Sequence, residues 1–339
     1  MKEGKKGIAI AGTLIADTFY KIDTYPEPGN LTKIRDIVYY IGGTGNTILD
    51  LAKLDPKLPL KLSGIIGEDA QGRMMKEKLQ EFPNIDLANL TVTKDGFSSV
   101  THVMNAQDTK QRTFFYQGGA GDIYEEKYID WEAIDAEIFH LQYLLLMDKA
   151  DSPDPEYGTH AARILHDARK RGMKTSVDMV SEQSDRAPGI VSAALKYTDY
   201  CAINEVEAEA GTGVQLPAEG PTEAWAKKAL LKMKEKGVTT WAVIHCPSCG
   251  YGYDCQTDTF VSVPSLTLPE GYIRGTNGAG DAYCSGILYG AYQGMTLQDS
   301  MILGTACAAC SLSEVNGTDG MRSYEKTMEL YRKFSRAAD

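Results

Sequence analysis

The feature that most constrains the fold of this chain is a regular alternation between short apolar runs and amphipathic segments. Six runs rich in β-branched residues have the length and composition of buried strands. Between them, four segments place apolar residues three and four positions apart with charges opposite, as in helices that cover a sheet. Strands that alternate with helices predict an α/β fold, a three-layer α/β/α sandwich with a mostly parallel sheet. The runs are 7–12, 60–67, 138–146, 174–180, 199–203 and 239–245, and the helical segments are 46–54, 71–82, 158–172 and 223–237.

Two segments interrupt this alternation. Residues 15–40 and 98–117 show period-two patterning with turn signals, such as Pro28 followed by Gly29, and no helical pattern. We expect them to pair into a small β-sheet that forms a lid. Because no repeat, linker or low-complexity tract divides the 339 residues, the lid is predicted as an insertion into one domain, 1–339.

Charge and cysteine content exclude several classes of partner. A net charge of −11 argues against binding to a nucleic-acid backbone, and no run reaches the ~20 apolar residues of a membrane span. We therefore expect a cytoplasmic protein. The seven cysteines are an odd number in a long chain, which indicates reduced thiols. Two Cys-x-x-Cys pairs, at Cys246 and Cys307, lie too far apart for the usual zinc-ribbon spacing.

The stretch RGTNGAGDAYCSG, residues 274–286, carries the strongest chemical signal. If a helix begins at Gly278, the unhindered N–H groups of Gly278, Ala279 and Gly280 and the helix dipole can hold a phosphoryl group. Asp281 would repel phosphate unless it accepts a proton from an attacking hydroxyl. A glycine turn with an aspartate cap explains the tetrapeptide equally well. The chain lacks GxxxxGK[ST], and it lacks GxGxxG after the first strand, so the sequence supports neither a P-loop nor a dinucleotide fold.

Other polar residues follow predicted strands. Asp17 could hold two adjacent sugar hydroxyls, or it could be an exposed turn residue. Gly42 and Gly43 in YYIGGTGN allow close approach of a ligand, and Asn46 follows them as a ligand contact or a helix cap. In NEVE, residues 204–207, Asn204 could be a simple helix N-cap followed by an acidic first turn. Alternatively, Asn204 and Glu207 could lie near magnesium-bound phosphates and contact them through waters.

Taken together, these residues resemble the ribokinase-like (PfkB) carbohydrate kinase family. The order along the chain matches: an early Asp, Gly-Gly before Asn, the segment RTFFYQGGAG, Asn-x-x-Glu, and GAGD before a small-residue helix. The resemblance implies an ATP- and Mg²⁺-dependent kinase with Asp281 as base, and a lid that often forms a homodimer. It implies acceptor contacts from Asp17, Gly42, Gly43, Asn46 and Arg112, and nucleotide contacts from Asn204, Glu207, His245, Gly250, Thr276 and Asn316, with Glu207 near Mg²⁺ through water.

Three departures from the family pattern affect these expectations. Gly275 stands where the family usually has an Asp in a loop that binds a monovalent cation, so dependence on that cation is doubtful. Pro247 follows the last buried strand where the family often has glycine, which removes an N–H donor on the nucleotide side. The spacing between Gly-Gly and Asn is one residue tighter than usual, so either Asn46 or Thr47 fills the acceptor slot.

Three functions remain open. The first is an ATP-dependent kinase that phosphorylates a hydroxyl of a small sugar, ketose or sugar acid. The second is a nucleoside kinase of the adenosine type, and the third is a non-catalytic sugar or nucleotide sensor with the same fold. A phosphosugar acceptor is also open, because Lys33, Arg35 and Arg112 lie in the lid segments and could hold a second phosphate.

Overall fold

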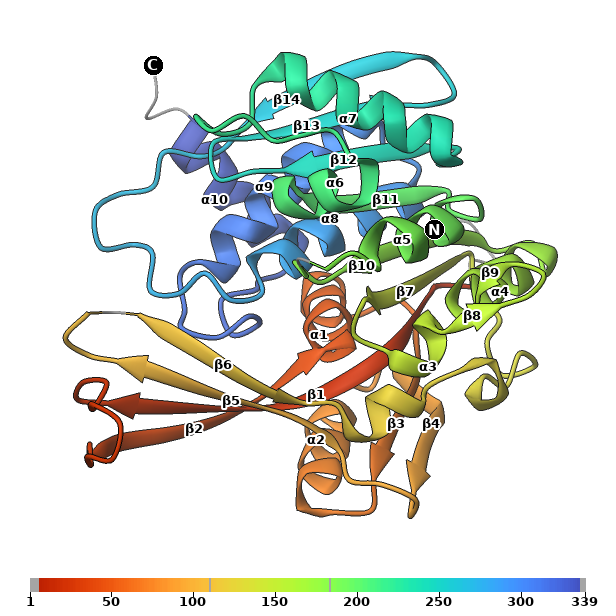
Figure 1. Ribbon diagram of the computed structural model, residues 1–339. Coiled ribbons are helices and arrows are strands. Elements are labelled where there is room, and N and C mark those ends of the chain that lie inside the picture. The colour runs from red at the N-terminus through yellow and green to blue at the C-terminus, as the bar shows by residue number, and fades with distance from the viewer. Residues whose placement is uncertain (1–5, 110, 183, 336–339) are drawn as a thin grey trace.

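The computed structural model describes residues 6–109, 111–182 and 184–335 (Figure 1). The remaining residues of the predicted domain, 1–5, 110, 183 and 336–339, lie outside the described residues. The predicted three-layer α/β/α sandwich is confirmed: helices cover both faces of a large, mostly parallel sheet. Among the described residues, no helix is long and apolar enough to cross a membrane.

The main sheet has the strand order β14-β13-β12-β11-β10-β7-β1-β3-β4. The strands from β12 to β4 run parallel, and their continuous apolar sequences follow from burial of both sheet faces. The sequence did not predict β4, β13 or β14, because these strands are partly exposed and polar. The strands are β1 (Ile8–Ile22), β3 (Leu60–Gly67), β4 (Ile85–Thr93), β7 (Ile138–Leu144), β10 (Lys174–Met179), β11 (Tyr200–Asn204), β12 (Trp241–His245), β13 (Cys249–Asp254) and β14 (Thr259–Pro264).

Two hydrophobic layers hold the helices against the sheet. One face carries α1 (Thr44–Leu54), α2 (Ala70–Gln80), α8 (Ala279–Gln293), α9 (Leu297–Ser311) and α10 (Tyr324–Ser335). The other carries α4 (His160–Lys170), α5 (Ala187–Leu195), α6 (Glu205–Thr212) and α7 (Glu223–Lys236). Short elements complete the second face: 3-10 helices η1 (Gly119–Ile123) and η2 (Glu126–Tyr128), helix α3 (Asp148–Asp151), and a small β8–β9 pair (Pro153–Asp154 with Gly158–Thr159).

The small second sheet grows out of the main one through strand β1. Up to Thr13, β1 pairs with strands of the main sheet; from Leu14 onward it pairs with β2 (Ile34–Gly43) and β5 (Ser99–Ala106). Strand β6 (Arg112–Gln117) completes this sheet, which we call the lid, and Figure 1 shows it projecting from the body. The first strand was expected to end at residue 12, but it continues because its apolar residues stay buried into the lid.

Candidate active site

Two cavities meet at the carboxyl ends of the parallel strands, where sheets of this class hold ligands. The lid cavity, about 620 Å³, is lined by residues that include Asp17, Asn46, Tyr116, Asp178 and Asp281. The helix cavity, about 490 Å³, is lined by residues that include Pro247, Gly250, Leu266, Tyr283 and Ala308. Both cavities are lined by Asn204, His245, Thr276 and Gly280, so these four residues mark the point where the two spaces join.

The first turn of α8 lies at this junction. Gly278 caps the helix with φ of 75°, a left-handed conformation that favours glycine. A Cβ atom on Gly278 would lie 2.3 Å from Cα of Gly317, so a side chain does not fit there. The first N–H groups of a helix have no partner within the helix. Ala279 lines the helix cavity and Gly280 lines both, so their backbone can face a ligand.

Asp281 follows these residues and is buried. Its Oδ2 accepts a hydrogen bond from Nδ2 of Asn46 at 3.0 Å, and its Oδ1 accepts one from the hydroxyl of Tyr143. Burial raises the pKa of Asp281, and these donors oppose that rise, so the pKa is about 6. Asp281 is therefore mainly a carboxylate at neutral pH, as a proton acceptor must be.

Asp17 faces Asp281 from the lid. It lies within β1, buried between Tyr40 and Thr101 on the neighbouring strands, so the alternative of an exposed turn residue is wrong. Burial raises its pKa to about 7. A Cβ atom on Gly42 would lie 2.3 Å from Oδ2 of Asp17, so the glycine at this position leaves room for the carboxylate.

The tight Gly-Gly-Asn spacing places Asn46, and not Thr47, in the lid cavity. Thr47 is fully buried and donates a hydrogen bond to Oε1 of Gln142 at 2.8 Å. Asn46 lines the cavity together with Gly43, on the first turn of α1.

Asn204 and Glu207 form a capping box at the start of α6. The side chain of Asn204 accepts hydrogen bonds from the N–H groups of Val206 and Glu207, both at 2.9 Å, and the Glu207 side chain accepts from the Asn204 N–H at 2.9 Å. Both residues also line the lid cavity. Burial raises the pKa of Glu207 to about 7. Asn204 is therefore a helix N-cap, as one of the two interpretations predicted, and Asn204 and Glu207 also border the cavity.

His245 ends strand β12 beside the junction. Its ring packs against Tyr283 with centroids 5.2 Å apart, and its Cε1 would lie 3.2 Å from a Cβ atom on Gly280. Burial lowers the pKa of His245 to about 4, so the imidazole is neutral at pH 7. A neutral ring beside the first turn of α8 can donate one N–H to a ligand.

Comparison with known proteins decides the family. The family description "pfkB family carbohydrate kinase" matches residues 6–323. The chain belongs to this family. This pfkB kinase is 22% identical over 310 residues to the 5-dehydro-2-deoxygluconokinase of Shouchella clausii, which covers 88% of the chain and 89% of the relative. It is also 22% identical over 303 residues to the adenosine kinase of Schizophyllum commune, which covers 84% of the chain and 83% of the relative.

Solved structures agree in fold. The ribokinase of Arabidopsis thaliana, complexed with ribose and ATP, superimposes with a TM-score of 0.78 and 20% identity, covering 97% of this chain and 99% of the other. A ribokinase from Thermotoga maritima gives 0.77 and 20% identity, with 96% and 99% covered. The pfkB chain has the ribokinase-like fold and is an ATP-dependent carbohydrate kinase, a phosphotransferase with an alcohol group as acceptor.

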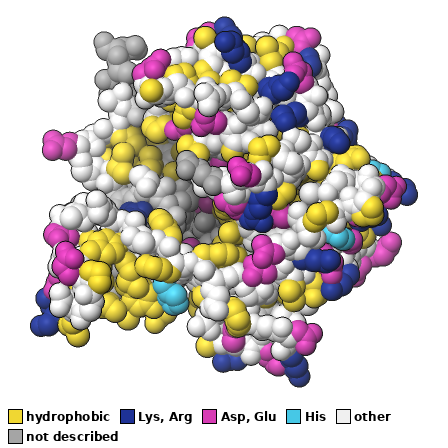
Figure 2. Space-filling view, in the orientation of Figure 1, with side chains coloured by type: hydrophobic (Ala, Val, Ile, Leu, Met, Phe, Trp, Pro, Cys, Tyr) yellow, Lys and Arg dark blue, Asp and Glu magenta, His cyan; other side chains and the backbone are white. Residues whose placement is uncertain are grey.

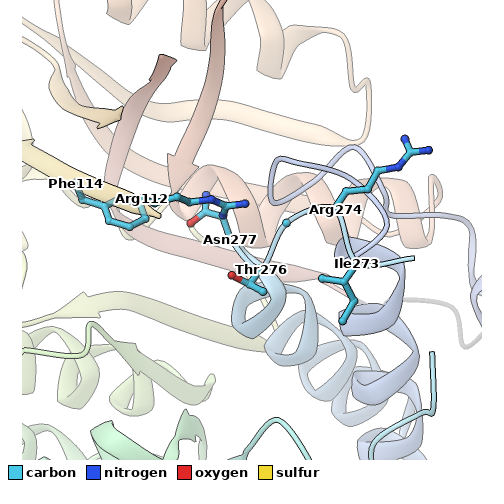
Figure 3. A pocket seen from close by; sticks show the side chains of 7 residues that line it. Arg112, Phe114, Ile273, Arg274, Thr276 and Asn277 are labelled. Carbon is cyan, nitrogen blue, oxygen red and sulfur yellow. The ribbon is translucent and has the colours of Figure 1, made fainter. Parts of the chain in front are cut away.

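Three predicted contacts of this pfkB kinase, Gly42, Asn316 and Arg112, line neither the lid cavity nor the helix cavity. Asn316 lines neither cavity: it is buried, and its Oδ1 accepts hydrogen bonds from the N–H groups of Thr318 and Asp319 in the loop after α9. Arg112 lines a third cavity of about 590 Å³, which shares Phe114, Thr276 and Asn277 with the lid cavity. Figure 3 shows Arg112 extending from β6 toward Asn277, whereas Arg274 points away from both.

Tyr143 and Asp178 are among the side chains of the lid cavity that sequence reasoning missed. Asp178 stands near the carboxyl end of a predicted strand, which was a usable signal for a ligand-side carboxylate. Burial, with Glu207 and Asp281 nearby, raises its pKa well above the usual range. Tyr143 lies in the apolar run 138–146 and gave no signal, because a tyrosine in a buried strand is an ordinary core residue.

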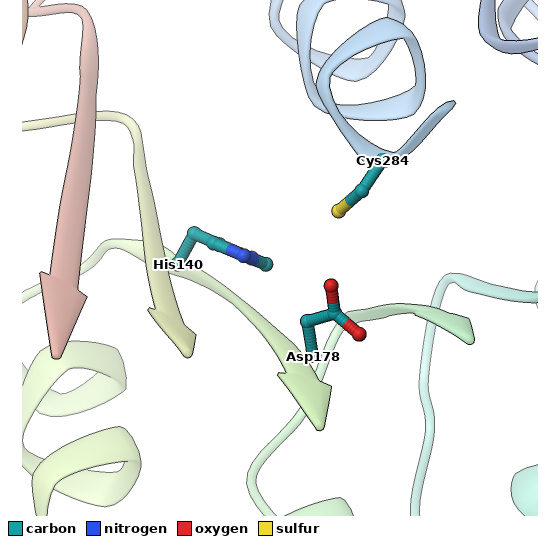
Figure 4. Close-up of side chains that lie close together, drawn as sticks. All are labelled: His140, Asp178 and Cys284. Carbon is teal, nitrogen blue, oxygen red and sulfur yellow. The ribbon is translucent and has the colours of Figure 1, made fainter. Parts of the chain in front are cut away.

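Asp178 also lies close to His140 and Cys284, and Figure 4 shows the three side chains directed toward one another from β10, β7 and α8. Both ring nitrogens of His140 are already used: Nε2 bonds Oε1 of Gln142 at 2.7 Å and Nδ1 bonds the Ser176 hydroxyl at 2.9 Å. Because Oε1 of Gln142 only accepts, Nε2 carries the hydrogen and Nδ1 accepts from Ser176. In this arrangement the ring offers no free lone pair to a metal ion, so we assign no metal to the cluster.

Proposed function

We propose that this kinase transfers the γ-phosphoryl group of ATP to a hydroxyl of a small sugar, ketose or sugar acid. The observation that carries the proposal is the meeting of two cavities at the first turn of α8, directly beside Asp281. One cavity then takes the nucleotide and the other the acceptor. The likeness to a ribokinase complexed with ribose and ATP supports this assignment.

In the proposed reaction, the acceptor hydroxyl lies in the lid cavity and gives its proton to Asp281. The acceptor oxygen bonds to the γ-phosphorus, the bond from that phosphorus to the β–γ bridging oxygen breaks, and ADP leaves. The N–H groups at Gly278, Ala279 and Gly280 stabilise the charge on the transferred group. His245 and Thr276 contact the phosphates, and Gly250 borders the nucleotide. The lid excludes water, which competes as acceptor.

The carboxylates of Asp178 and Glu207 fit a magnesium ion. Both are buried, and the pKa of each is raised, so a bound cation would relieve the cost of two nearby negative charges. When bound, Mg²⁺ supplies charge neutralisation for the ATP phosphates. We propose that these two residues hold it, with Glu207 acting through water because its oxygens already bond Asn204 and Ser181.

A monovalent cation fits the loop at Gly275 less well than Mg²⁺ fits the carboxylates of Asp178 and Glu207. Gly275 has no side chain and so supplies no carboxylate to a cation. A Cβ atom there would lie 2.6 Å from the carbonyl oxygen of Val315 and 2.9 Å from that of Glu314, so a side chain does not fit at this position. Protein contacts join the same two loops: the Arg274 N–H donates to the Leu312 carbonyl at 2.9 Å, and the Arg274 guanidinium lies 3.3 Å from the Glu314 carboxylate. We propose that activity is independent of K⁺.

A nucleoside acceptor is the second candidate. Phe114, Tyr116 and Tyr143 give the lid cavity aromatic surfaces on which a base could stack. The adenosine kinase of Schizophyllum commune is as similar in sequence as the deoxygluconokinase relative. A coupled assay of ADP release over sugars, ketoses, sugar acids, phosphosugars and nucleosides tests the proposal. Fastest turnover on a sugar, ketose or sugar acid supports it, fastest turnover on adenosine or inosine reverses it, and ATP binding without turnover on any acceptor supports a sensor.

We also propose that the lid forms a homodimer. In register, Tyr39, Thr18, His102 and Phe115 form a row on the lid face opposite the row of Asp17 and Tyr116. Tyr39 and Phe115 are 62% and 55% exposed, and Figure 2 shows hydrophobic side chains gathered over the lid. Light scattering of the purified protein checks this proposal: a mass of one chain across micromolar concentrations contradicts it.

A further inference from the structure

Several buried carboxyl groups surround the reaction centre, and they cannot all be charged. Asp50 is fully buried and its two oxygens accept no hydrogen bond from the described residues. Burial raises the pKa of Asp50 and of Asp178 well above the usual range, which favours the neutral form of each unless a cation is bound nearby. Asp17 and Glu207 have pKa values near 7. The base must remain charged among these neighbours.

Asp281 differs from the others because both of its oxygens receive side-chain donors from separate elements. Asn46 approaches from the first turn of α1, and Tyr143 approaches from the end of β7. A tyrosine hydroxyl carries one hydrogen, and here that hydrogen is directed to Oδ1. A hydrogen bond to a carboxylate favours its charged form. Each carboxylate oxygen has two lone pairs, so it can accept from an acceptor hydroxyl as well as from a protein donor.

Two further observations on Tyr143 support this task. Burial raises the pKa of its own hydroxyl far above the usual range, so the hydroxyl stays protonated and remains a donor. The ring lines the lid cavity beside Leu146 and Asp178, so its edge also limits where an acceptor can reach Asp281. The contact joins residues 138 positions apart in sequence, and so belongs to the assembled site.

We propose that Tyr143 is a positioning residue for the base: its hydroxyl holds the carboxylate of Asp281 in the charged form and fixes the direction from which the acceptor hydroxyl approaches. The inference rests on the proposed function of Asp281. Tyr143 acts through that carboxylate and takes no proton from the acceptor itself.

The test is the pH dependence of kcat/KM for Tyr143→Phe, with the acceptor found in the panel. In the wild type, kcat/KM falls as pH drops through about 6, because Asp281 becomes protonated. Loss of the donor disfavours the charged form, so the acid limb moves upward by about one pH unit. With such a shift, the loss of kcat/KM in the variant relative to wild type is about fivefold larger at pH 6 than at pH 9.

Tyr124→Phe is the matched control. Tyr124 is fully buried, and its hydroxyl bonds that of Ser63 at 2.8 Å, away from both cavities. Its removal is expected to leave the acid limb in place. The inference is overturned if Tyr143→Phe lowers kcat/KM by the same factor at all pH values, or if the acid limb of its pH profile does not shift. If Tyr143→Phe does not fold, Tyr143→Leu also lacks the hydroxyl and must show the same shift.

Asp281→Asn separates the two levels of the argument. If Asp281→Asn is inactive and the limb of Tyr143→Phe is unshifted, the role of Tyr143 is wrong while the role of Asp281 stands. If Asp281→Asn keeps wild-type turnover, the proposed function of that residue is wrong, and with it the basis of this inference.

Discussion

Replacement of Gly278 by alanine tests the phosphate-binding turn most directly, because the same helix supplies its control. Gly278 begins α8 and Gly294 ends it, and both have φ of 75°. A Cβ atom on Gly294 meets nothing within 4 Å, whereas one on Gly278 lies 2.3 Å from Cα of Gly317. The two alanine variants therefore share the cost of a left-handed residue, and only one of them displaces the backbone.

The structure sets the size of each effect. A left-handed alanine costs about 1–2 kcal/mol of unfolding free energy, and this applies to both variants. Ordinary contact begins at 3.4 Å, so Gly278→Ala must move the first turn of α8 or the loop at Gly317 by about 1 Å. A misplacement of that size lowers kcat about 100-fold. Gly294→Ala leaves kcat within about threefold of wild type, because the shared strain lies a whole helix away from the site.

Two measurements on each variant separate stability from catalysis. Urea unfolding gives the shared stability cost, and the coupled ADP assay at saturating ATP and acceptor gives kcat. A Gly278→Ala protein that is folded and retains more than a third of wild-type kcat would refute the assignment of this turn to the transferred phosphoryl group. Equal losses of kcat in the two variants would show that strain alone accounts for the effect.

Three further outcomes follow from the site. Because Gly275 supplies no carboxylate, rates in K⁺, Na⁺ or tetramethylammonium should agree within about twofold, and a tenfold rise in K⁺ would contradict this. Asp178→Asn and Glu207→Gln should each raise the Mg²⁺ concentration for half-maximal rate about tenfold, while the exposed Glu132→Gln leaves it unchanged; equal values in all three would remove the proposed ligands. Asp17→Asn should raise the acceptor KM about 10- to 100-fold with the ATP KM unchanged, and the reverse pattern would place Asp17 on the nucleotide side.

The fold was predictable from the sequence because its central strands are buried on both faces. Such strands read as continuous apolar runs, and β3, β7 and β10 lie where the runs predict them. The edge strands β4 and β14 were missed because their stability depends on pairing with a neighbour, which local sequence does not record.

The site was predictable only where backbone demands shaped the sequence. Gly278 and the residues after it stand out because a bare turn needs small residues, and that pattern is local. The contact from Tyr143 to Asp281 is not local, since chain folding brings a tyrosine from an apolar strand to the first turn of α8, 138 positions away in sequence. The sequence left two alternatives open for Asp17 for the same reason: the strand continues past Gly12 because of tertiary burial in the lid, which local sequence does not record.

The central claim is that Asp281 accepts the proton of the acceptor hydroxyl, and Asp281→Asn measures it. The substitution keeps the size of the side chain and removes its basicity, so calorimetry should show ATP binding within about threefold of wild type, while kcat falls about 100- to 10,000-fold. Wild-type turnover with intact ATP binding would contradict the account, because another group would then be taking the proton.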